Sequence, residues 1–310
     1  MKAAQIAEYG HADIVNVVEV DRPLAEKGQV LVEVQAASLN PFDTMVREGY
    51  LKDMIPLDLP VTLGGDIAGV VSEVGDGVEG FAAGDIVYGQ ANVVAGNSGA
   101  LAEYAATKTE QVAKAPAGID ITEAASLPLI GSSALQALND HIRLTADQKI
   151  FIHGGAGAIG SIAIELAKKI GAYVATTATG EGIDLVKTLG ADAVIDYKSE
   201  DFSQKLSDYD AVFDTVGGED FNKSLAILKK GGVAVSMAAQ PDEAKAAELE
   251  VTALNQMTHV TTAKLQELAK LVEDGVIKPR VGKVFPLSGV QQAFVARESG
   301  EVQGKIVVHL

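Results

Sequence analysis

The sequence predicts an α/β protein in which a doubly wound parallel sheet is joined to a small β-barrel domain. Three patterns support this fold class. A glycine-rich turn at residues 154–160 lies between a short apolar run and an apolar stretch with helical spacing. Strand-like and helix-like segments alternate from about residue 120 to 240, which is typical of a parallel sheet. Before residue 120, short strands broken by glycines indicate a small barrel.

The first 120 residues are predicted to form mainly strands. Residues 15–20, 30–36, 67–74 and 86–89 are apolar or alternate over strand lengths. A short helix is expected over residues 41–47, ahead of a glycine.

The middle of the chain is predicted to alternate between helices and strands. A helix should begin at Ile121 with Thr122 as its N-cap, be interrupted at Pro128, and be followed by a second helix over residues 131–138. Strands are then expected at residues 149–153, 173–177, 193–196, 210–214 and 233–237, with helices after the glycine turn and at residues 183–189 and 221–228.

The pattern weakens after Pro241. Helices are expected over residues 242–249 and 261–273, and the final strand, residues 305–310, should return to the barrel. The predicted domains are therefore residues 1–122, completed by residues 262–310, and a dinucleotide-binding domain of the Rossmann type at residues 123–261.

The glycine turn carries a dinucleotide-binding motif. Gly155, Gly157 and Gly160 satisfy G-x-G-x-x-G between a strand and a helix. Glycine suits the tight turn, and a pyrophosphate oxygen can approach the backbone only where no Cβ intrudes. The N–H groups at the start of the helix, at Ala158 and Ile159, are then available to the anion. The turn therefore predicts a nucleotide cofactor.

Composition limits the partners. The 25 basic and 42 acidic residues give a formal charge of −17, which argues against nucleic acid or an anionic membrane surface. The chain has no cysteine, which excludes disulfides, thiolate metal sites and a cysteine nucleophile. There is no run of about 18 apolar residues and no apolar leader, so a cytoplasmic protein with a small-molecule substrate is expected.

The residues after the second strand of the dinucleotide fold indicate which cofactor binds. NAD-binding folds place an acid there for the ribose 2′-OH. Residues 176–180 contain no acid, and the hydroxyls of Thr176, Thr177 and Thr179 can donate to a 2′-phosphate. We therefore expect NADPH, with NADH as the alternative because Glu181 has the wrong charge and the loop lacks Lys and Arg.

Five segments resemble the zinc-independent quinone oxidoreductases of the medium-chain dehydrogenase/reductase family: NPFD at 40–43, LGGDIAGVV at 63–71, GDIVYG at 84–89, DTVGG at 214–218 and GKIVV at 304–308. They follow the order of the family and span nearly the whole chain. The resemblance implies a GroES-like barrel built from both chain ends, a Rossmann domain between them, and a homodimer.

Zinc-dependent members of the superfamily carry a Cys where Asn40 stands and a His-Glu pair where Gly65 and Asp66 stand. None of these ligands is present, and the five histidines have no ligand spacing, so no metal is expected. The resemblance then implies hydride transfer from NADPH to a quinone or an enone, because conjugation already spreads the developing charge. A zinc-dependent alcohol dehydrogenase would lose its usual charge stabilisation here.

The resemblance also implies site residues. It places Asn40 and Asp43 beside the nicotinamide and the substrate, and Tyr50 is a further candidate because it can line the pocket. Alternatively, Asn40 and Asp43 cap the following helix, Tyr50 is a packing residue, and the Ser133 hydroxyl bonds its own backbone. With the glycine motif and the threonine loop, the expected cofactor-binding residues are Ser133, Gly155, Gly157, Ala158, Ile159, Gly160, Thr177, Thr179, Tyr197, Val216, Met237, Ala238 and Lys305.

Two departures from the family pattern affect this site. A lysine for the 2′-phosphate is common where Gly182 stands, and a tyrosine is common where Met45 stands. Two other functions also fit the sequence: an enoyl or alkenal reductase that prefers acyclic enones, and an NADPH-binding protein with little catalysis in a redox-responsive or structural role. Pocket shape separates the first from a quinone reductase, and steady NADPH turnover with an enone would exclude the second.

Overall fold

The chain folds into two units that interleave along the sequence. The computed structural model describes residues 1–310. The first unit comprises Met1–Leu129, Val260–Gly275 and Pro279–Leu310, and the second comprises Ile130–His259 and Val276–Lys278. The sequence placed the first boundary before residue 123, whereas in the structure α2 (Ile121–Ala125) packs on strands of the first unit.

The first unit is built from two β-sheets. The larger has seven strands in the order β15-β16-β3-β5-β6-β8, with β7 also paired to β3, and the smaller has the order β2-β1-β4. All pairs are antiparallel except β15 with β16. The strands are β1 (Lys2–Ile6), β2 (Asn16–Glu19), β3 (Gln29–Ser38), β4 (Val61–Thr62), β5 (Asp66–Val74), β6 (Ile86–Gln90), β7 (Tyr104–Lys108), β8 (Val112–Lys114), β15 (Val281–Pro286) and β16 (Lys305–His309).

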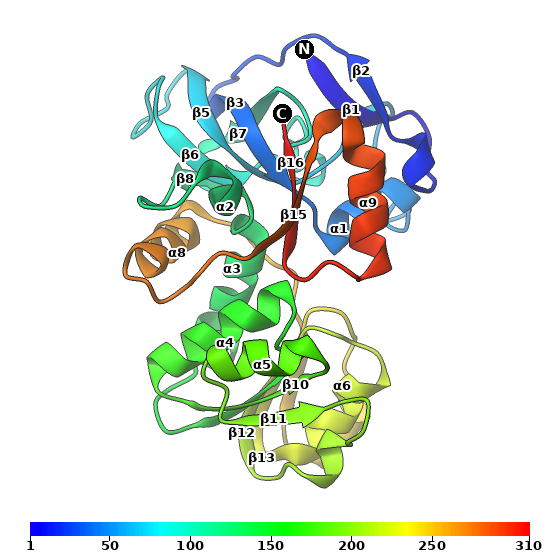
Figure 1. The fold of residues 1–310 in the computed structure, drawn as a ribbon, viewed down its shortest axis with the longest axis vertical. Helices are drawn as coiled ribbons and strands as arrows, with labels where there is room; N and C mark the ends of the chain where they lie inside the picture. The colour runs from blue at the N-terminus through cyan, green and yellow to red at the C-terminus, as the bar shows by residue number, and fades with distance from the viewer. The chain divides into compact units, whose positions relative to one another are not determined.

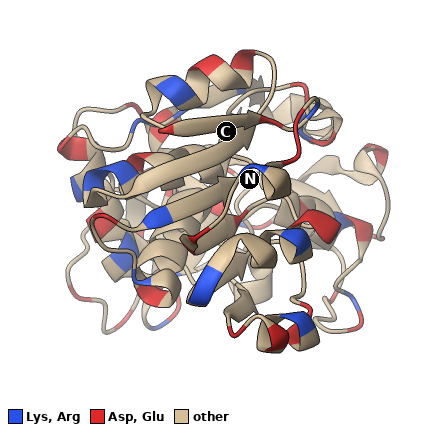
Figure 2. Ribbon diagram, turned by 90° about the horizontal axis from the view of Figure 1, so that it is seen from below, with Lys and Arg blue, Asp and Glu red and all other residues tan.

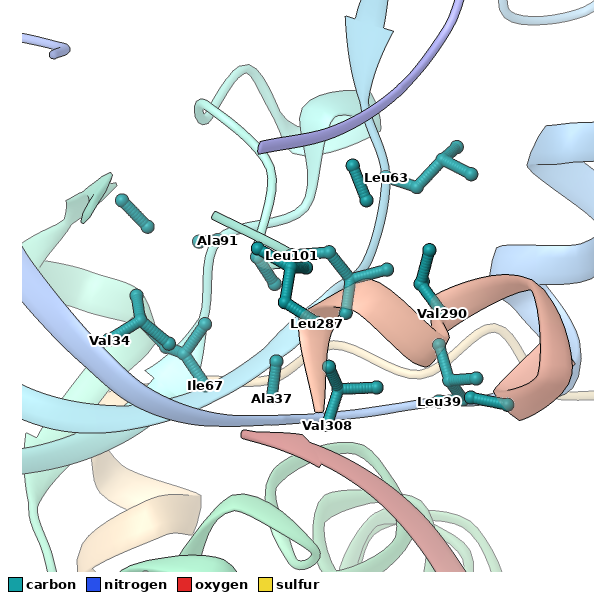
Figure 3. Packing of buried hydrophobic residues seen from close by; sticks show 14 of the residues in the cluster. Val34, Ala37, Leu39, Leu63, Ile67, Ala91, Leu101, Leu287, Val290 and Val308 are labelled. Carbon is teal, nitrogen blue, oxygen red and sulfur yellow. The ribbon is translucent and has the colours of Figure 1, made fainter. Parts of the chain in front are cut away.

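The C-terminal strand belongs to the sheet of the first unit, because β16 pairs antiparallel with β3, Val308 opposite Ala37. The helices of this unit are α1 (Pro41–Glu48), α2, α8 (Thr262–Glu273) and α9 (Val290–Ser299). Figure 3 shows the apolar core that these elements enclose, in which Leu101, Leu287 and Val290 pack with Ile67. The core thus joins residues from both ends of the chain.

The second unit is a six-stranded parallel sheet with the order β11-β10-β9-β12-β13-β14. This doubly wound order confirms the predicted fold class. In Figure 1, α4 and α5 lie side by side, and they pack on β9, β10 and β11. The elements are α3 (Pro128–Leu135), β9 (Lys149–His153), α4 (Ala158–Ile170), β10 (Tyr173–Ala178), α5 (Glu181–Thr188), β11 (Ala193–Asp196), β12 (Tyr209–Asp214), α6 (Glu219–Ser224), β13 (Leu228–Ser236), α7 (Glu243–Glu248) and β14 (Thr252–Asn255).

Two local expectations were wrong, and one strand was not predicted. Pro128 begins α3 instead of interrupting a helix, because the first helical position needs no intrahelical N–H. The N-cap of α2 is Asp120, not Thr122, since Asp120 and Glu123 form a capping box. The sixth strand, β14, has too short and mixed a pattern to be recognised from sequence.

The charged residues and the apolar helices of the structure bear on membrane insertion and on the surface. No helix is long and apolar enough to cross a membrane. In Figure 2, segments with basic residues lie among segments with acidic residues along the helices and loops.

Truncating Leu101 should destabilise the first unit. Leu101 is fully buried, so Leu101→Ala leaves a cavity and should lower the free energy of unfolding by about 2–5 kcal/mol. Leu24 is 76% exposed, so the matched Leu24→Ala change should stay within about 0.5 kcal/mol of wild type. Urea denaturation of both variants checks this, and equal stabilities would contradict the packing in Figure 3.

Candidate active site

The glycine loop lies at the point where the strand order of the second unit reverses. Residues 154–157 connect β9 to α4, and β9 lies between β10 and β12. Doubly wound sheets bind ligands at such a point, beyond the carboxyl ends of the strands. The topology therefore places the predicted cofactor motif where a ligand is expected.

The glycines of the loop have different roles. A methyl group on Gly155 would lie 2.1 Å from Thr176 Oγ1, and one on Gly160 would lie 2.3 Å from the Gly154 carbonyl oxygen, so packing requires both. Gly157 is exposed, and a methyl group there would meet only the Gly154 oxygen, at 3.2 Å. Gly157 is also the N-cap of α4 and supplies no side-chain cap, so the first N–H groups of the helix remain for an anion. The loop therefore fits a pyrophosphate.

The threonines at the end of β10 mainly support the protein. Thr176 Oγ1 donates to the Ile152 carbonyl oxygen at 2.6 Å, and Thr177 Oγ1 accepts from the Gly154 N–H at 2.9 Å. Both side chains are buried. Thr177 thus holds the glycine loop, a role that its position near the end of the strand did not reveal.

Thr179 follows a strand residue that is paired with an acid, Asp196, which the sequence argument missed. Asp196, at the end of β11, is aligned with Ala178 at the end of β10. Hydrogen bonds from the Lys198 N–H and the Thr179 hydroxyl hold the pKa of Asp196 below its usual range. The neighbouring Tyr197 is 56% exposed. A carboxylate therefore stands beside the predicted 2′-phosphate site, on the third strand instead of the second.

Gly182, near the start of α5, lies close to the glycine loop. A methyl group on Gly182 would lie 2.9 Å from the Cβ of Ala156, in the glycine loop. A longer side chain there, such as the lysine expected from the family pattern, would require this contact to open.

Asp214 organises the loops that follow β12 and β13. Its carboxylate accepts from His153 Nδ1 at 3.1 Å, from the Gly217 N–H and from the Ser236 hydroxyl. The loop after Asp214 leaves Val216 56% exposed. Ser236 Oγ in turn accepts from the Ala238 N–H at 3.1 Å, so one buried carboxylate fixes both loops.

Gln256 links two predicted cofactor residues. Its Nε2 donates to the Ser133 carbonyl oxygen at 3.0 Å and lies 3.3 Å from Met237 Sδ, while its buried Oε1 has no hydrogen-bond partner. Ser133 is fully buried, and its hydroxyl bonds Thr258 Oγ1 at 2.8 Å. Sequence reasoning missed Gln256 because its contacts are with residues distant in the chain.

The first unit contains a buried polar cluster around Asp66. The Asp66 carboxylate accepts from Asn40 Nδ2 at 2.8 Å, from Gln90 Nε2 at 3.1 Å and from Ser38 Oγ at 3.3 Å. The Lys305 ammonium lies 3.8 Å from it and donates to Leu39 O at 2.9 Å and to Asn40 Oδ1. The NH₂ group and the oxygen of the Asn40 amide are therefore both hydrogen-bonded within the protein.

Asp43 caps the first helix, as one of the two sequence interpretations proposed. Its Oδ2 accepts from the Asn40 N–H at 2.7 Å at the start of α1. Burial raises the pKa of the Asp43 carboxyl to about 7, and nearby Asp66 adds to the rise, while the Asn40 N–H, Lys305 and Arg297 oppose it. The carboxyl therefore takes up and releases a proton near neutral pH.

The structure brings together only some of the predicted site residues of this unit. Asn40, Asp43 and Lys305 share the buried cluster, where Lys305 is 4% exposed and its donors are engaged by the first unit. Tyr50 lies outside the cluster and is 71% exposed. Tyr88, another tyrosine of the barrel strands, is a packing residue whose hydroxyl donates to Leu265 O.

The two glycines of the loop should respond differently to a methyl group. Gly157→Ala should fold normally but weaken dinucleotide binding about tenfold or more, because the methyl group occupies the approach to the backbone. Gly155→Ala should instead lower the melting temperature, because its methyl group clashes with Thr176. Nicotinamide fluorescence and thermal unfolding measure the two effects, and unchanged affinity in Gly157→Ala would exclude the loop as the pyrophosphate site.

Asp43 should also give stability a distinctive pH dependence. Its pKa is near 3.8 in the unfolded chain and about 7 in the folded protein, so the folded state holds the extra proton between these values. Its contribution is therefore full below pH 4 and is lost as pH rises to 7, by at most about 1.4 kcal/mol per pH unit.

Asp43→Asn, which does not titrate, should remove this dependence. Urea denaturation at pH 5, 6 and 7 should show the stability of wild type falling relative to the variant as pH rises. A constant difference would mean that Asp43 ionises with an ordinary pKa.

Known proteins match this chain over its whole length. Residues 26–117 match the family described as the alcohol dehydrogenase GroES-like domain, and residues 189–308 match the zinc-binding dehydrogenase family. The sequence is 36% identical to 2-methylene-furan-3-one reductase of Solanum lycopersicum, covering 100% of this chain and 79% of that protein. Identity and coverage are the same for the chloroplastic NADPH-dependent alkenal/one oxidoreductase of Arabidopsis thaliana.

A solved structure has the same fold. The quinone oxidoreductase from Coxiella burnetii superposes with a TM-score of 0.91 at 33% identity, covering 100% of this chain and 99% of that one. The residues, the topology and these relatives agree, and the chain belongs to the medium-chain dehydrogenase/reductase family, together with the quinone and alkenal/one oxidoreductases.

Proposed function

We propose that this protein is an NADPH-dependent oxidoreductase that delivers a hydride to a quinone or to the activated double bond of an enone, without zinc. The observation that carries the proposal is the glycine loop at the switch point of the sheet, where Gly157 leaves the backbone open to a pyrophosphate. The relatives support the substrate class, since they are named as reductases of conjugated carbonyl compounds and quinones.

The residues of the second unit fit the cofactor in three groups. The loop at Gly155 and Gly157 and the N–H groups of Ala158, Ile159 and Gly160 would hold the pyrophosphate. Thr177 would hold the loop, and Thr179 and Tyr197 would lie at the adenosine end. Bound NADPH supplies a hydride from its nicotinamide ring, toward which we assign Ser133, Val216, Met237 and Ala238.

The first unit would supply the substrate side. Asp43 is the candidate acid because its carboxyl holds a proton near neutral pH. Both the nitrogen and the oxygen of the Asn40 amide are hydrogen-bonded. We therefore assign Asn40 and Lys305 to positioning Asp43 and not to transferring a proton. Tyr50 is exposed enough to contact a substrate. No group of three His, Asp or Glu side chains is arranged to hold a metal ion.

Cytoplasmic location and homodimer assembly, both expected from the sequence and the resemblance, belong to the same proposal. Sedimentation velocity at several protein concentrations tests the second. A species with the mass of one chain, 32.1 kDa, at all concentrations would exclude the homodimer.

Nucleotide titration and turnover test the activity. Wild type should bind NADPH more tightly than NADH and should oxidise NADPH in the presence of 2-cyclohexen-1-one or 1,4-benzoquinone. Because Asp196 places a negative charge near the 2′-phosphate, Asp196→Asn should raise NADPH affinity about tenfold and leave NADH affinity unchanged.

Lys198→Gln is the matched control on the same loop. It removes a nearby positive charge and should therefore lower the affinity for NADPH. Tighter binding of NADH than NADPH by wild type would make the cofactor assignment wrong. NADPH binding without turnover of either carbonyl compound would instead favour a binding protein with little catalysis.

A further inference from the structure

A small space lies beside Gly65, just before β5, and polar side chains of the first unit face it. A methyl group built on Gly65 would lie 3.6 Å from Asn92 Nδ2 and 3.7 Å from both Gln90 Nε2 and Asp43 Oδ1. These are ordinary van der Waals distances, so an atom of about this size fits without displacing a neighbour. The backbone of Gly65 is not in the left-handed region, so its conformation does not require glycine.

Hydrogen bonds fix which end of each amide faces this space. Asn92 Oδ1 accepts from the Val94 N–H at 2.9 Å, which leaves the NH₂ group of Asn92 toward Gly65. Gln90 Nε2 donates to Asp66 Oδ1 at 3.1 Å, so its nitrogen also lies on the side of Asp66 and Gly65. An amide NH₂ carries two donors, and Gln90 therefore retains a second one. The amide orientations follow from these partners and not from the shape of the side chains.

Asp43 is the third polar side chain that faces the space beside Gly65. Its Oδ2 is engaged by the Asn40 N–H, whereas Oδ1 is the atom that faces the space. The charged groups around the carboxyl are Asp66 on β5, Lys305 on β16 and Arg297 on α9. Burial dominates over these charges and raises the pKa of Asp43 to about 7, so a protonated carboxyl is available near neutral pH.

We infer that the space beside Gly65 binds the carbonyl oxygen of the substrate, with the amide groups of Asn92 and Gln90 as hydrogen-bond donors and Asp43 as the acid. The inference rests on the proposed function, because it assigns the group shared by enones and quinones. Two amide nitrogens and one carboxyl oxygen lie around one point, and such a set suits an oxygen that gains negative charge during reduction.

The chemistry balances without a further reactant. As the β-carbon of an enone gains a hydride and forms its new C–H bond, the electron pair of the C=C bond shifts toward the carbonyl and the C=O pair moves onto oxygen. The amide donors stabilise that oxygen, which then takes the proton of Asp43 and leaves a carboxylate. Water reprotonates Asp43, and the enol becomes the saturated ketone. A quinone gains the same hydride and proton to give a hydroquinone.

Two substitutions test the site while keeping the fold. Gly65→Ala fills the space with a methyl group at contact distance. Asn92→Asp keeps the oxygen that caps Val94 but places an oxygen where the NH₂ group was. Gly289→Ala is the matched control, because its methyl group would also lie in ordinary contact, 3.5 Å from Pro286, in the same unit but among apolar atoms.

Three measurements are made on the full-length protein: steady-state kinetics with 2-cyclohexen-1-one and 1,4-benzoquinone, NADPH affinity, and ligand-observed NMR of 2-cyclohexen-1-one without cofactor. Both site variants should lose kcat/KM on the order of 10–100-fold for both acceptors. They should also bind cyclohexenone more weakly in the NMR experiment. NADPH affinity and the control variant should match wild type.

The outcomes separate the inference from the proposed function. If wild type is active and Gly65→Ala and Asn92→Asp keep its kcat/KM and its affinity for cyclohexenone, the carbonyl site is overturned and the proposed function stands. If wild type reduces neither acceptor, the proposed function is wrong, and the inference of a carbonyl site is wrong as well. Loss of kcat/KM together with loss of ketone binding supports the site.

Discussion

The buried carboxylate of Asp66 is the constraint on which the first unit depends. Burial raises the pKa of Asp66, and an ionised carboxylate at 0% exposure costs several kcal/mol unless it is paired and hydrogen-bonded. Its partners come from segments far apart in the sequence: Ser38, Asn40, Gln90, Leu129 and Lys305. The fold can therefore satisfy this carboxylate only when the C-terminal strand has joined β3 and α1 has formed.

The same constraint arranges the candidate site. Because Asp66 engages Asn40 and Gln90, it fixes the start of α1 and the direction of an amide at the end of β6. The side chains that face Gly65 are thus held by a network that a purely apolar core would not provide. In the second unit, Asp214 has the corresponding role for the loops that carry Val216 and Ala238.

Sequence reasoning recovered features that local patterns determine. The glycine loop, the strands around it and the alternation of the second unit follow from motif and periodicity, and the structure has them. Features set by pairing between distant segments were not recoverable. Asp196 lies beside Thr179 only because β10 and β11 are in a particular register, and Asn92 faces Gly65 only because a one-turn helix is capped by its side-chain oxygen. Nothing in the residues near either position signals these contacts.

Glycine positions show how the same residue type can mark packing or binding. At Gly155 and Gly160 a methyl group would collide with the protein itself, so glycine is needed for the fold. At Gly157 and Gly65 a methyl group would meet neighbours at 3.2 Å or more, and the space is bounded by polar atoms. Glycine at these two positions is not required by packing and is consistent with the proposed approach of a ligand to the backbone, which a motif alone does not distinguish.

The placement of Lys305 explains how an acid can persist near neutral pH inside the protein. A lysine ammonium bonded directly to Asp43 would lower the pKa of that carboxyl and leave it ionised. Lys305 instead donates to Leu39 and Asn40 and pairs with Asp66, so it influences Asp43 only at longer range. Lys305 thus lies closer to Asp66 than to a direct bond with Asp43, and burial keeps the pKa of Asp43 raised. A carboxyl whose burial raises its pKa to about 7 has the protonation behaviour that the proposed proton transfer requires.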